Sequence, residues 1–264
     1  MKVVAIVLGV VAVLYVLLCI VLYFKQESLL FFPAKLPASY RFHFPGRFEE
    51  RWTTAADGTK LHGLLFKAPD SKGLIFYLHG NGGALDSWGD AAATYTRLHY
   101  DVFMLDYRGY GKSGGRISSQ AQLLSDVQTA YQQLFPEYPE SRTVILGYSV
   151  GTGLAAWLAA QHHPKLLILQ APYFSMRDLS ARIYPFLPSG VILRYPLLTN
   201  EFVRQVSAPI VLFHGDRDEV IYYESSLKLK ALLKPSDKLV VLPGVGHNGM
   251  TDNSLYQREI AKIL

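Results

Sequence analysis

The chain has 264 residues, 50% of them hydrophobic, so it is long enough to bury a core and fits one domain beside a short additional segment. Its only cysteine, Cys19, excludes an intramolecular disulfide and any metal site built from several cysteines. The net charge is +5, but basic residues are not interleaved with aromatic ones as in nucleic-acid binding proteins, so we expect no nucleic-acid partner.

The N-terminus carries an apolar run over residues 3–24 that contains no charged residue. As a helix rising about 1.5 Å per residue, the run extends roughly 33 Å, enough to cross the hydrocarbon core of a bilayer. The apolar region of a cleavable signal peptide is shorter, about 7–15 residues, and precedes a small-residue cleavage site. This run ends in Val21-Leu22-Tyr23-Phe24 instead. The sequence therefore predicts an uncleaved, single-span membrane anchor over residues 1–25.

The charges around the anchor support two orientations. Lys2 precedes the run, whereas Lys25, Lys35 and Arg41 follow it. The excess of basic residues after the run favours a cytoplasmic location for the rest of the chain. A short basic start before a long apolar run is, however, typical of a signal anchor that exports the domain behind it, and we predict the exported side.

Residues 26–50 are predicted to connect the anchor to a domain over residues 51–264, in which strand and helix patterns alternate. Short apolar runs indicate strands at 61–66, 74–78, 102–107, 144–148, 166–170, 210–214 and 239–242. Helical patterns occupy 84–98, 120–134, 151–162, 223–234 and 252–264. This alternation predicts an α/β domain with a mostly parallel sheet flanked by helices, in which ligands bind beyond the carboxyl ends of the strands.

One connection between predicted strands is unusually long. It spans the 36 residues 173–208, well beyond the roughly 15 at which loops become uncommon, and contains Pro185, Pro188, Pro196 and several aromatic residues. An ordinary apolar excursion packed on the domain is one interpretation. We predict instead a small cap of short helices over the end of the sheet.

The stretch Gly147-Tyr148-Ser149-Val150-Gly151 lies between a predicted strand and a predicted helix. In this context a G-x-S-x-G sequence is typical of a nucleophile elbow, a turn so sharp that the serine adopts a strained backbone conformation. The flanking glycines have no Cβ, so strand and helix can approach closely. The turn presents the Ser149 hydroxyl at the helix N-terminus, where backbone N–H groups can stabilise a developing oxyanion.

A serine hydroxyl needs a base to remove its proton, usually a histidine oriented by a carboxylate. On an open α/β sheet the order along the chain is serine, acid, histidine. Apart from His162 and His163 at the end of the next helix, only His214 and His247 follow Ser149. His214 ends a predicted strand, and we expect its side chain to serve the adjoining turn. His247 lies in a loop before the last helix and is the predicted base.

The acid is Asp216 or Asp218, which both follow the strand at 210–214. Asp218 lies further into the loop, from which a carboxylate can reach a histidine on the next loop. The spacing favours Asp218 only modestly, so Asp216 stays open on this ground alone.

An oxyanion hole needs a second N–H donor besides the amide of Val150. The stretch His79-Gly80-Asn81-Gly82-Gly83 follows a predicted strand and precedes a helix, so its amides lie at the same end of the sheet. We predict the Asn81 amide as this donor, with Gly82 as the alternative.

The stretch Gly109-Tyr110-Gly111-Lys112-Ser113-Gly114 matches the G-x-G-x-x-G fingerprint of dinucleotide sites. Such a site has a helix that opens within the motif, whereas Gly115-Arg116 and two serines intervene here. The Gly-Lys-Ser portion also lacks the earlier glycine of a nucleotide-binding loop, because Asp106 stands at that position. We therefore predict a turn beside the site and no cofactor.

Together these motifs resemble the α/β-hydrolase family, and in particular its membrane-anchored branch of alpha/beta-hydrolase domain-containing proteins, related to the serine-aminopeptidase-like group. The resemblance covers about residues 50–264 and rests on five stretches: 79–82, 106–113, 147–151, 214–218 and 246–248. It implies that Ser149 is the nucleophile, Asp218 the acid and His247 the base, while Asn81 and Val150 supply the oxyanion amides. Where the family often has a proline shortly after the acid, this chain has Ile221-Tyr222-Tyr223.

The predicted function is that of a membrane-anchored serine hydrolase that cleaves an acyl ester through an acyl-enzyme. Thioester and amide bonds pass through the same tetrahedral intermediate, so a thioesterase, an amidase or a peptidase stays an alternative, as does acyl transfer to an alcohol. The anchor and the aromatic cap favour a small-molecule or lipid-like acyl substrate. The rival from another class is a non-catalytic binding protein that retains the fold.

Overall fold

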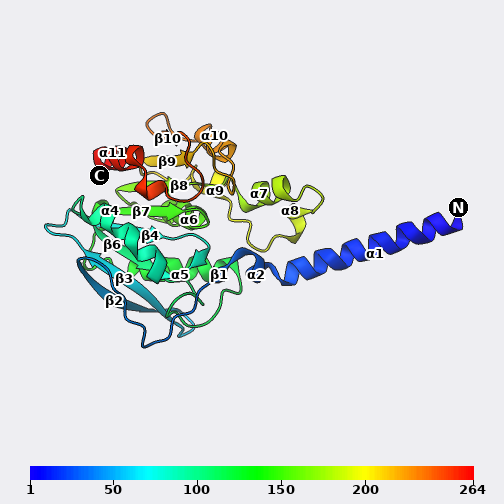
Figure 1. The fold of residues 1–264 in the computed structure, drawn as a ribbon, viewed down its shortest axis with the longest axis horizontal. Coiled ribbons are helices and arrows are strands. Elements are labelled where there is room, and N and C mark those ends of the chain that lie inside the picture. Colours follow the sequence, from blue (N-terminus) through cyan, green and yellow to red (C-terminus); the bar gives the residue numbers. More distant parts are fainter.

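An eight-stranded sheet forms the centre of the computed structural model, which describes residues 1–264 (Figure 1). The strand order is β10-β9-β8-β7-β4-β6-β3-β2, in which β3 pairs antiparallel with β6 and β2 antiparallel with β3, and every other pairing is parallel. The strands are β2 (Arg47–Thr54), β3 (Lys60–Lys67), β4 (Leu74–Leu78), β6 (Asp101–Leu105), β7 (Thr143–Tyr148), β8 (Leu166–Gln170), β9 (Ile210–Gly215) and β10 (Lys238–Leu242).

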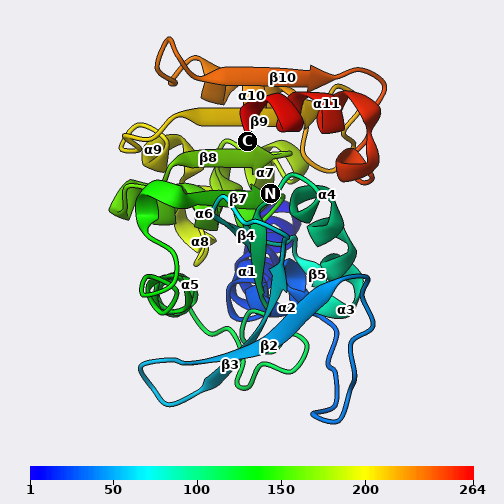
Figure 2. The ribbon, with the colours of Figure 1, turned by 90° about the vertical axis from the view of Figure 1, so that its left-hand side faces the viewer.

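Helices cover both faces of this sheet. Leu74, Phe76 and Leu78 of β4 pack in one apolar cluster with α5 (Gln120–Gln132) and α6 (Gly151–Gln161). The alternate residues Ile75 and Tyr77 pack in a second cluster with three other helices, α3 (Leu85–Trp88), α4 (Ala92–Thr96) and α11 (Ser254–Ile263). Figure 2 shows these two groups of helices on opposite sides of the sheet. The parallel strands are buried on both faces, which is why they read as continuous apolar runs.

The predicted α/β architecture is confirmed, and its strands agree closely with the structure. The predicted bounds at 74–78 and 166–170 match β4 and β8, and α10 (Glu224–Lys230) lies within the helix predicted at 223–234. The helix predicted at 84–98 is instead divided into α3, a 3-10 turn at Gly89–Ala91 and α4. Further 3-10 turns lie at Glu140–Arg142 and Met250–Asp252.

Strand β2 was not predicted, and it corrects the domain boundary. It runs from Arg47 to Thr54 at the edge of the sheet, so the boundary predicted at residue 51 falls inside it. The strand is rich in charged residues because one face of an edge strand meets solvent. Its sequence is Arg47-Phe48-Glu49-Glu50-Arg51-Trp52-Thr53-Thr54. A strand of this composition contains no apolar run, so its sequence alone does not predict it.

Helix α1 (Lys2–Phe24) projects from the domain and buries none of its residues against it (Figure 1). Its length and its apolar composition are sufficient to cross a membrane, and a signal sequence near an N-terminus meets the same test. The chain continues through α2 (Gln26–Leu30) into β1 (Phe32–Pro33), which pairs in parallel with β5 (Gly82–Gly83). The N-terminal segment therefore joins the domain at the loop that follows β4.

Three short helices occupy the segment predicted as a cap, between β8 and β9. They are α7 (Met176–Ile183), α8 (Ser189–Ile192) and α9 (Thr199–Phe202). Figure 1 shows α7 and α8 on the side of the domain from which α1 projects.

Candidate active site

The turn between β7 and α6 has the strained geometry that its sequence predicts. Ser149 has φ = 52°, in the left-handed region that residues other than glycine rarely adopt. A Cβ on Gly147 would lie 2.4 Å from the carbonyl oxygen of Gly151, and one on Gly151 would lie 2.1 Å from that of Leu78. The backbones of strand and helix thus approach to a distance that only glycine permits at both positions.

Three side chains from separate loops meet at this turn. The Nε2 atom of His247 lies 3.0 Å from Ser149 Oγ, and its Nδ1 atom lies 2.8 Å from Asp218 Oδ2. The residues follow β7, β9 and β10, whose carboxyl ends lie at the same edge of the sheet. The structure therefore brings together the serine, histidine and acid expected from the sequence.

The sequence did not decide between Asp216 and Asp218 as the acid, and the two side chains have different contacts in the structure. The carboxylate of Asp216 accepts a hydrogen bond from the Gly244 amide at 2.6 Å, as a turn residue would. The side chain of Asp218 is buried, and its Oδ1 atom accepts from the amides of Val220 and Ile221 at 2.9 and 2.8 Å. Only Asp218 contacts the ring of His247.

The environment of Asp218 keeps its carboxylate charged. Burial raises the pKa of Asp218, but hydrogen bonds from His214 and His247 and from the Ile221 amide outweigh it, and the pKa lies well below the usual carboxyl range. A charged carboxylate fixes the tautomer of the imidazole and stabilises the imidazolium that forms when the ring takes a proton.

His214 has a contact that sequence reasoning missed. Its Nε2 atom lies 2.8 Å from the Ile221 carbonyl oxygen, which agrees with the expected role in the turn, and also 3.2 Å from Asp218 Oδ2. Its Nδ1 atom lies 2.7 Å from the hydroxyl of Ser226. The buried imidazole therefore contacts Oδ2 of Asp218, the same oxygen that the ring of His247 contacts. The only sequence signal is its position at the end of β9, four residues before Asp218.

Two backbone amides near the carboxyl ends of β4 and β7 have no partner in the chain. Neither Asn81 nor Val150 donates its N–H to another group of the protein. Asn81 follows β4, and Val150 is the N-cap residue of α6. Free amides at two adjacent strand ends have the character that an oxyanion hole requires.

The N-terminal segment supports the Asn81 loop, which the sequence did not predict. The Phe32 amide donates to the Asn81 carbonyl oxygen at 2.9 Å, and the Tyr110 hydroxyl donates to the same oxygen at 2.6 Å. The Asn81 side-chain amide in turn donates to the Leu30 carbonyl oxygen at 3.4 Å. The peptide group after Asn81 is thus held on two sides, and one of them is the segment that leaves α1.

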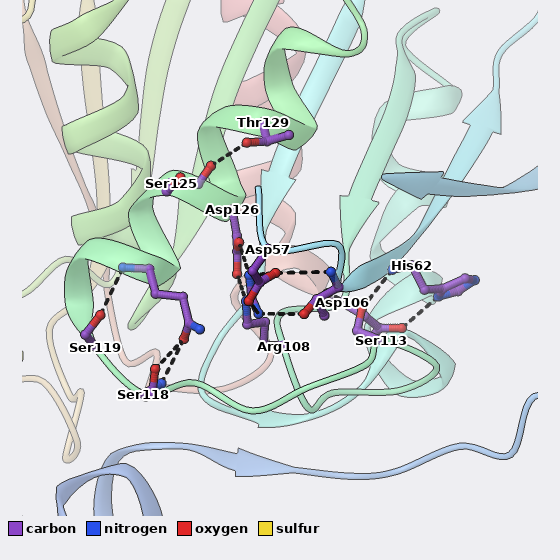
Figure 3. A network of polar contacts seen from close by, with 12 residues as sticks. Asp57, His62, Asp106, Arg108, Ser113, Ser118, Ser119, Ser125, Asp126 and Thr129 are labelled. Carbon is purple, nitrogen blue, oxygen red and sulfur yellow. Dashed lines mark hydrogen bonds and ion pairs between the residues drawn. The ribbon is translucent and has the colours of Figure 1, made fainter. Parts of the chain in front are cut away.

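The stretch from Asp106 to Gly114 is a structural turn, as predicted. The Gly109 amide donates to the Gly114 carbonyl oxygen, and a Cβ on Gly111 would lie 2.1 Å from a carboxylate oxygen of Asp106. Figure 3 shows Arg108 between Asp57 and Asp126, with which it forms ion pairs, while Asp106 contacts His62. The Arg108 guanidinium is thus paired with two carboxylates, and Asp106 is held by His62 beside the same turn.

Comparisons with known proteins show the family of this chain. Residues 69–200 match the family described as "Serine aminopeptidase, S33". The chain is 30% identical to the uncharacterized protein Rv2307c of Mycobacterium tuberculosis over 232 residues, which cover 85% of this chain and 81% of that protein. It is 28% identical to the alpha/beta hydrolase domain-containing protein WAV2 of Arabidopsis thaliana over 251 residues, covering 84% and 81%. The chain belongs to the α/β-hydrolase family.

A solved structure confirms the fold of this α/β hydrolase. The esterase Pf2001 of Pyrococcus furiosus superposes with a TM-score of 0.70 over 89% of this chain and 97% of its own, at 18% identity. At that identity the likeness concerns the fold. The family resemblance expected from the sequence is confirmed by the family model and the curated relatives.

Proposed function

We propose that this α/β hydrolase is a membrane-anchored serine hydrolase that cleaves an acyl ester through an acyl-enzyme. The observation that carries the proposal is the unbroken chain of contacts from Asp218 through His247 to Ser149, at 2.8 and 3.0 Å. A hydroxyl within hydrogen-bond reach of an imidazole, itself oriented by a buried carboxylate, is the arrangement that activates serine as a nucleophile.

The chemistry follows from the positions of these groups. Nε2 of His247 takes the Ser149 proton as Oγ attacks the acyl carbonyl carbon, and the amides of Asn81 and Val150 hold the oxygen that becomes negative. His247 then gives the proton to the departing alcohol, which leaves the acyl group on Ser149. Water gives a proton to His247 as its oxygen attacks the acyl carbonyl carbon. His247 then returns that proton to Ser149 Oγ as the bond between Oγ and the acyl carbon breaks, which releases the carboxylic acid and restores the serine. Asp218 stays charged throughout, because its pKa is held low.

A loss of labelling tests the nucleophile. The full chain in detergent is expected to react with a fluorophosphonate probe, and Ser149→Ala is expected to lose both labelling and about 10⁴-fold or more of ester turnover. Ser125→Ala is the matched control, because Ser125 is an exposed residue in the middle of α5. Retained labelling in a folded Ser149→Ala protein would end the proposal.

A series of substrates identifies the kind of bond that is cleaved. The triad treats esters, thioesters and amides alike, so nitrophenyl esters of increasing acyl length are compared with a matched thioester and an anilide. We expect the highest kcat/KM for an ester with a long acyl chain. A higher value for the anilide would instead assign an amidase or peptidase, and no turnover or labelling at all would favour a non-catalytic binding protein.

We further propose that residues 1–25 anchor the protein in the membrane and that residues 173–208 act as a cap, with the catalytic domain on the exported side. Ser125→Cys in a Cys19→Ser background places a single thiol on the domain surface. A membrane-impermeant maleimide applied to intact cells is expected to label it. Labelling only after lysis would place the domain in the cytoplasm.

A further inference from the structure

The cap is fastened to the segment that leaves the apolar helix. The Gln26 side chain is buried, and it donates to the Ile192 carbonyl oxygen at 2.6 Å and accepts from the Arg194 amide at 2.8 Å. Glu27 pairs with the Arg194 guanidinium at 2.8 Å and accepts from the Tyr195 hydroxyl at 2.7 Å. These contacts fix how the cap sits relative to α1.

A contact along α1 sets the depth of the cap. The Tyr15 hydroxyl donates to the Phe186 carbonyl oxygen at 2.7 Å. Tyr15 precedes Phe24, the last residue of α1, by nine residues, which is about 14 Å along a helix. Half of a hydrocarbon core of about 30 Å is about 15 Å. When α1 spans a bilayer, the segment that contacts Tyr15 therefore lies within the hydrocarbon.

The composition of this segment suits that depth. Residues 183–192, here called the cap tip, contain no charged side chain, and Arg182 and Arg194 lie on either side of them. Four of the side chains are exposed although apolar or aromatic: Ile183 at 50%, Tyr184 at 50%, Phe186 at 61% and Val191 at 82%. Exposed apolar side chains gathered beside an apolar helix mark a surface that another apolar phase covers.

Most of the cap-tip backbone is hydrogen-bonded within the protein, and only the N–H groups of Phe186 and Gly190 have no partner in the chain. Unsatisfied backbone groups are costly in hydrocarbon, so irregular segments there must satisfy their own N–H groups. Five N–H groups of the cap tip donate to carbonyl groups of the same segment or of α7: those of Tyr184, Leu187, Ser189, Val191 and Ile192. Pro185 and Pro188 have no N–H, and the Phe186 carbonyl accepts from Tyr15.

We propose that the cap tip inserts into the same leaflet as the root of α1, so that the bilayer covers it and acyl substrates reach the site from the membrane. The inference rests on the proposed membrane anchor and extends the proposed function. Arg182 and Arg194 then lie near the headgroups, where basic side chains are attracted to anionic lipids. The cap begins at the carboxyl end of β8, which is the neighbour of β7 in the sheet, so the segment that carries the tip starts at the same edge as Ser149.

Fluorescence quenching of the full chain in vesicles of phosphatidylcholine and phosphatidylglycerol tests the insertion. A fluorescent thiol label is placed at Phe186→Cys or Val191→Cys in a Cys19→Ser background. Labelled native Cys19 reports α1, and Ala261→Cys, exposed on α11 at the far side of the domain, reports water (Figure 1). We expect labels at 186 and 191 to be quenched by nitroxide-bearing acyl chains and protected from iodide, as Cys19 is, with the opposite pattern at 261.

Three results would overturn the inference, and each has a distinct meaning. Iodide quenching at 186 and 191 equal to that at 261 places the cap tip in water. Protection there from both quenchers indicates a protein partner or a second copy. Exposure of Cys19 to iodide shows that α1 does not span, and the anchor is then wrong as well. Fluorophosphonate labelling of Ser149 is independent of all three, so the hydrolase proposal is judged separately.

A functional measurement complements the quenching. Phe186→Asp combined with Val191→Asp places two carboxylates in the hydrocarbon and leaves Ser149 and its partners untouched. We expect a loss of about tenfold or more in turnover of a long-chain ester embedded in the vesicles, with turnover of a short water-soluble ester unchanged. An equal loss on both esters would point to damage to the fold and contradict a role in access from the membrane.

Discussion

The strained backbone of Ser149 predicts an unusual order of stabilities. In a helix, alanine is more stable than glycine because glycine loses more conformational freedom on folding. At Ser149 the positive φ reverses the preference, because a side chain at φ = 52° is strained and glycine is not. We therefore compare Ser149→Gly with Ser149→Ala, two variants that both lack the hydroxyl and its contact with His247.

The magnitude follows from two opposing terms. Relief of the left-handed conformation favours glycine by roughly 1–2 kcal/mol. The greater freedom of glycine in the unfolded chain offsets about 0.5–1 kcal/mol of this. Ser149→Gly should thus exceed Ser149→Ala by about 0.7 kcal/mol in the free energy of unfolding. At Ser125, in the middle of α5, the same pair should differ by about 1 kcal/mol in the opposite direction.

Urea denaturation of the full chain in detergent measures both differences. Tryptophan fluorescence is a suitable signal, because the Trp88 ring lies 5.3 Å from that of Tyr148 and Trp157 lies on α6. The free energy of unfolding of the glycine variant minus that of the alanine variant is expected to differ by about 2 kcal/mol between positions 149 and 125. Neither Ser149 variant should turn over an ester. If glycine were the less stable residue at 149 by the same margin as at 125, the elbow would carry no strain.

Three further measurements probe the surroundings of the site. His214→Ala should lower kcat about tenfold with KM unchanged, and His214→Gln, which keeps an N–H donor, should restore part of it; a change in KM alone would contradict positioning. Phe32→Pro removes the donor to the Asn81 carbonyl and should lower kcat/KM about tenfold, whereas Phe32→Ala keeps it and should not. The pKa of Asp218 is low, so the stability it contributes is present above the usual carboxyl range and is lost only as pH falls through the lowered value. We therefore expect the free energy of unfolding to show no loss from Asp218 between about pH 5 and pH 4 relative to Asp218→Asn, and a loss confined to the unsubstituted protein in that range would contradict the low pKa.

Local signals made the central features predictable. Apolar runs marked β4 and β8, because a strand covered on both faces has no polar alternation to obscure it. The elbow was predictable because its G-x-S-x-G pattern is local, although the close contact that requires Gly151 is with Leu78 of the neighbouring strand β4. His247 followed from chain order once Ser149 was chosen.

The rest depended on contacts between residues far apart in the sequence. Asp216 and Asp218 are separated by the path of one loop, which spacing does not encode. The contact of His214 with Asp218 depends on how the loop after β9 folds over the buried imidazole. Strand β1 pairs with the loop after β4 across about fifty residues, and nothing in Phe32-Pro33 signals a partner. These contacts form only when the whole chain is folded, and local sequence patterns do not predict them.

The pairing of β1 with β5 links the two halves of the proposed function. The Phe32 amide donates to the Asn81 carbonyl oxygen, and α1, the proposed anchor, ends eight residues earlier at Phe24. The wall of the proposed oxyanion hole and the end of α1 therefore belong to one continuous segment. Because Gln26 and Glu27 in that segment also hold the cap, a displacement of α1 in the bilayer acts on the cap and on the Asn81 loop together. A chain in which a flexible linker of equal length replaced residues 25–31 should keep its anchor yet lose turnover of soluble and vesicle-borne esters alike. Full activity in that chain would show that the anchor serves only to retain the enzyme at the membrane.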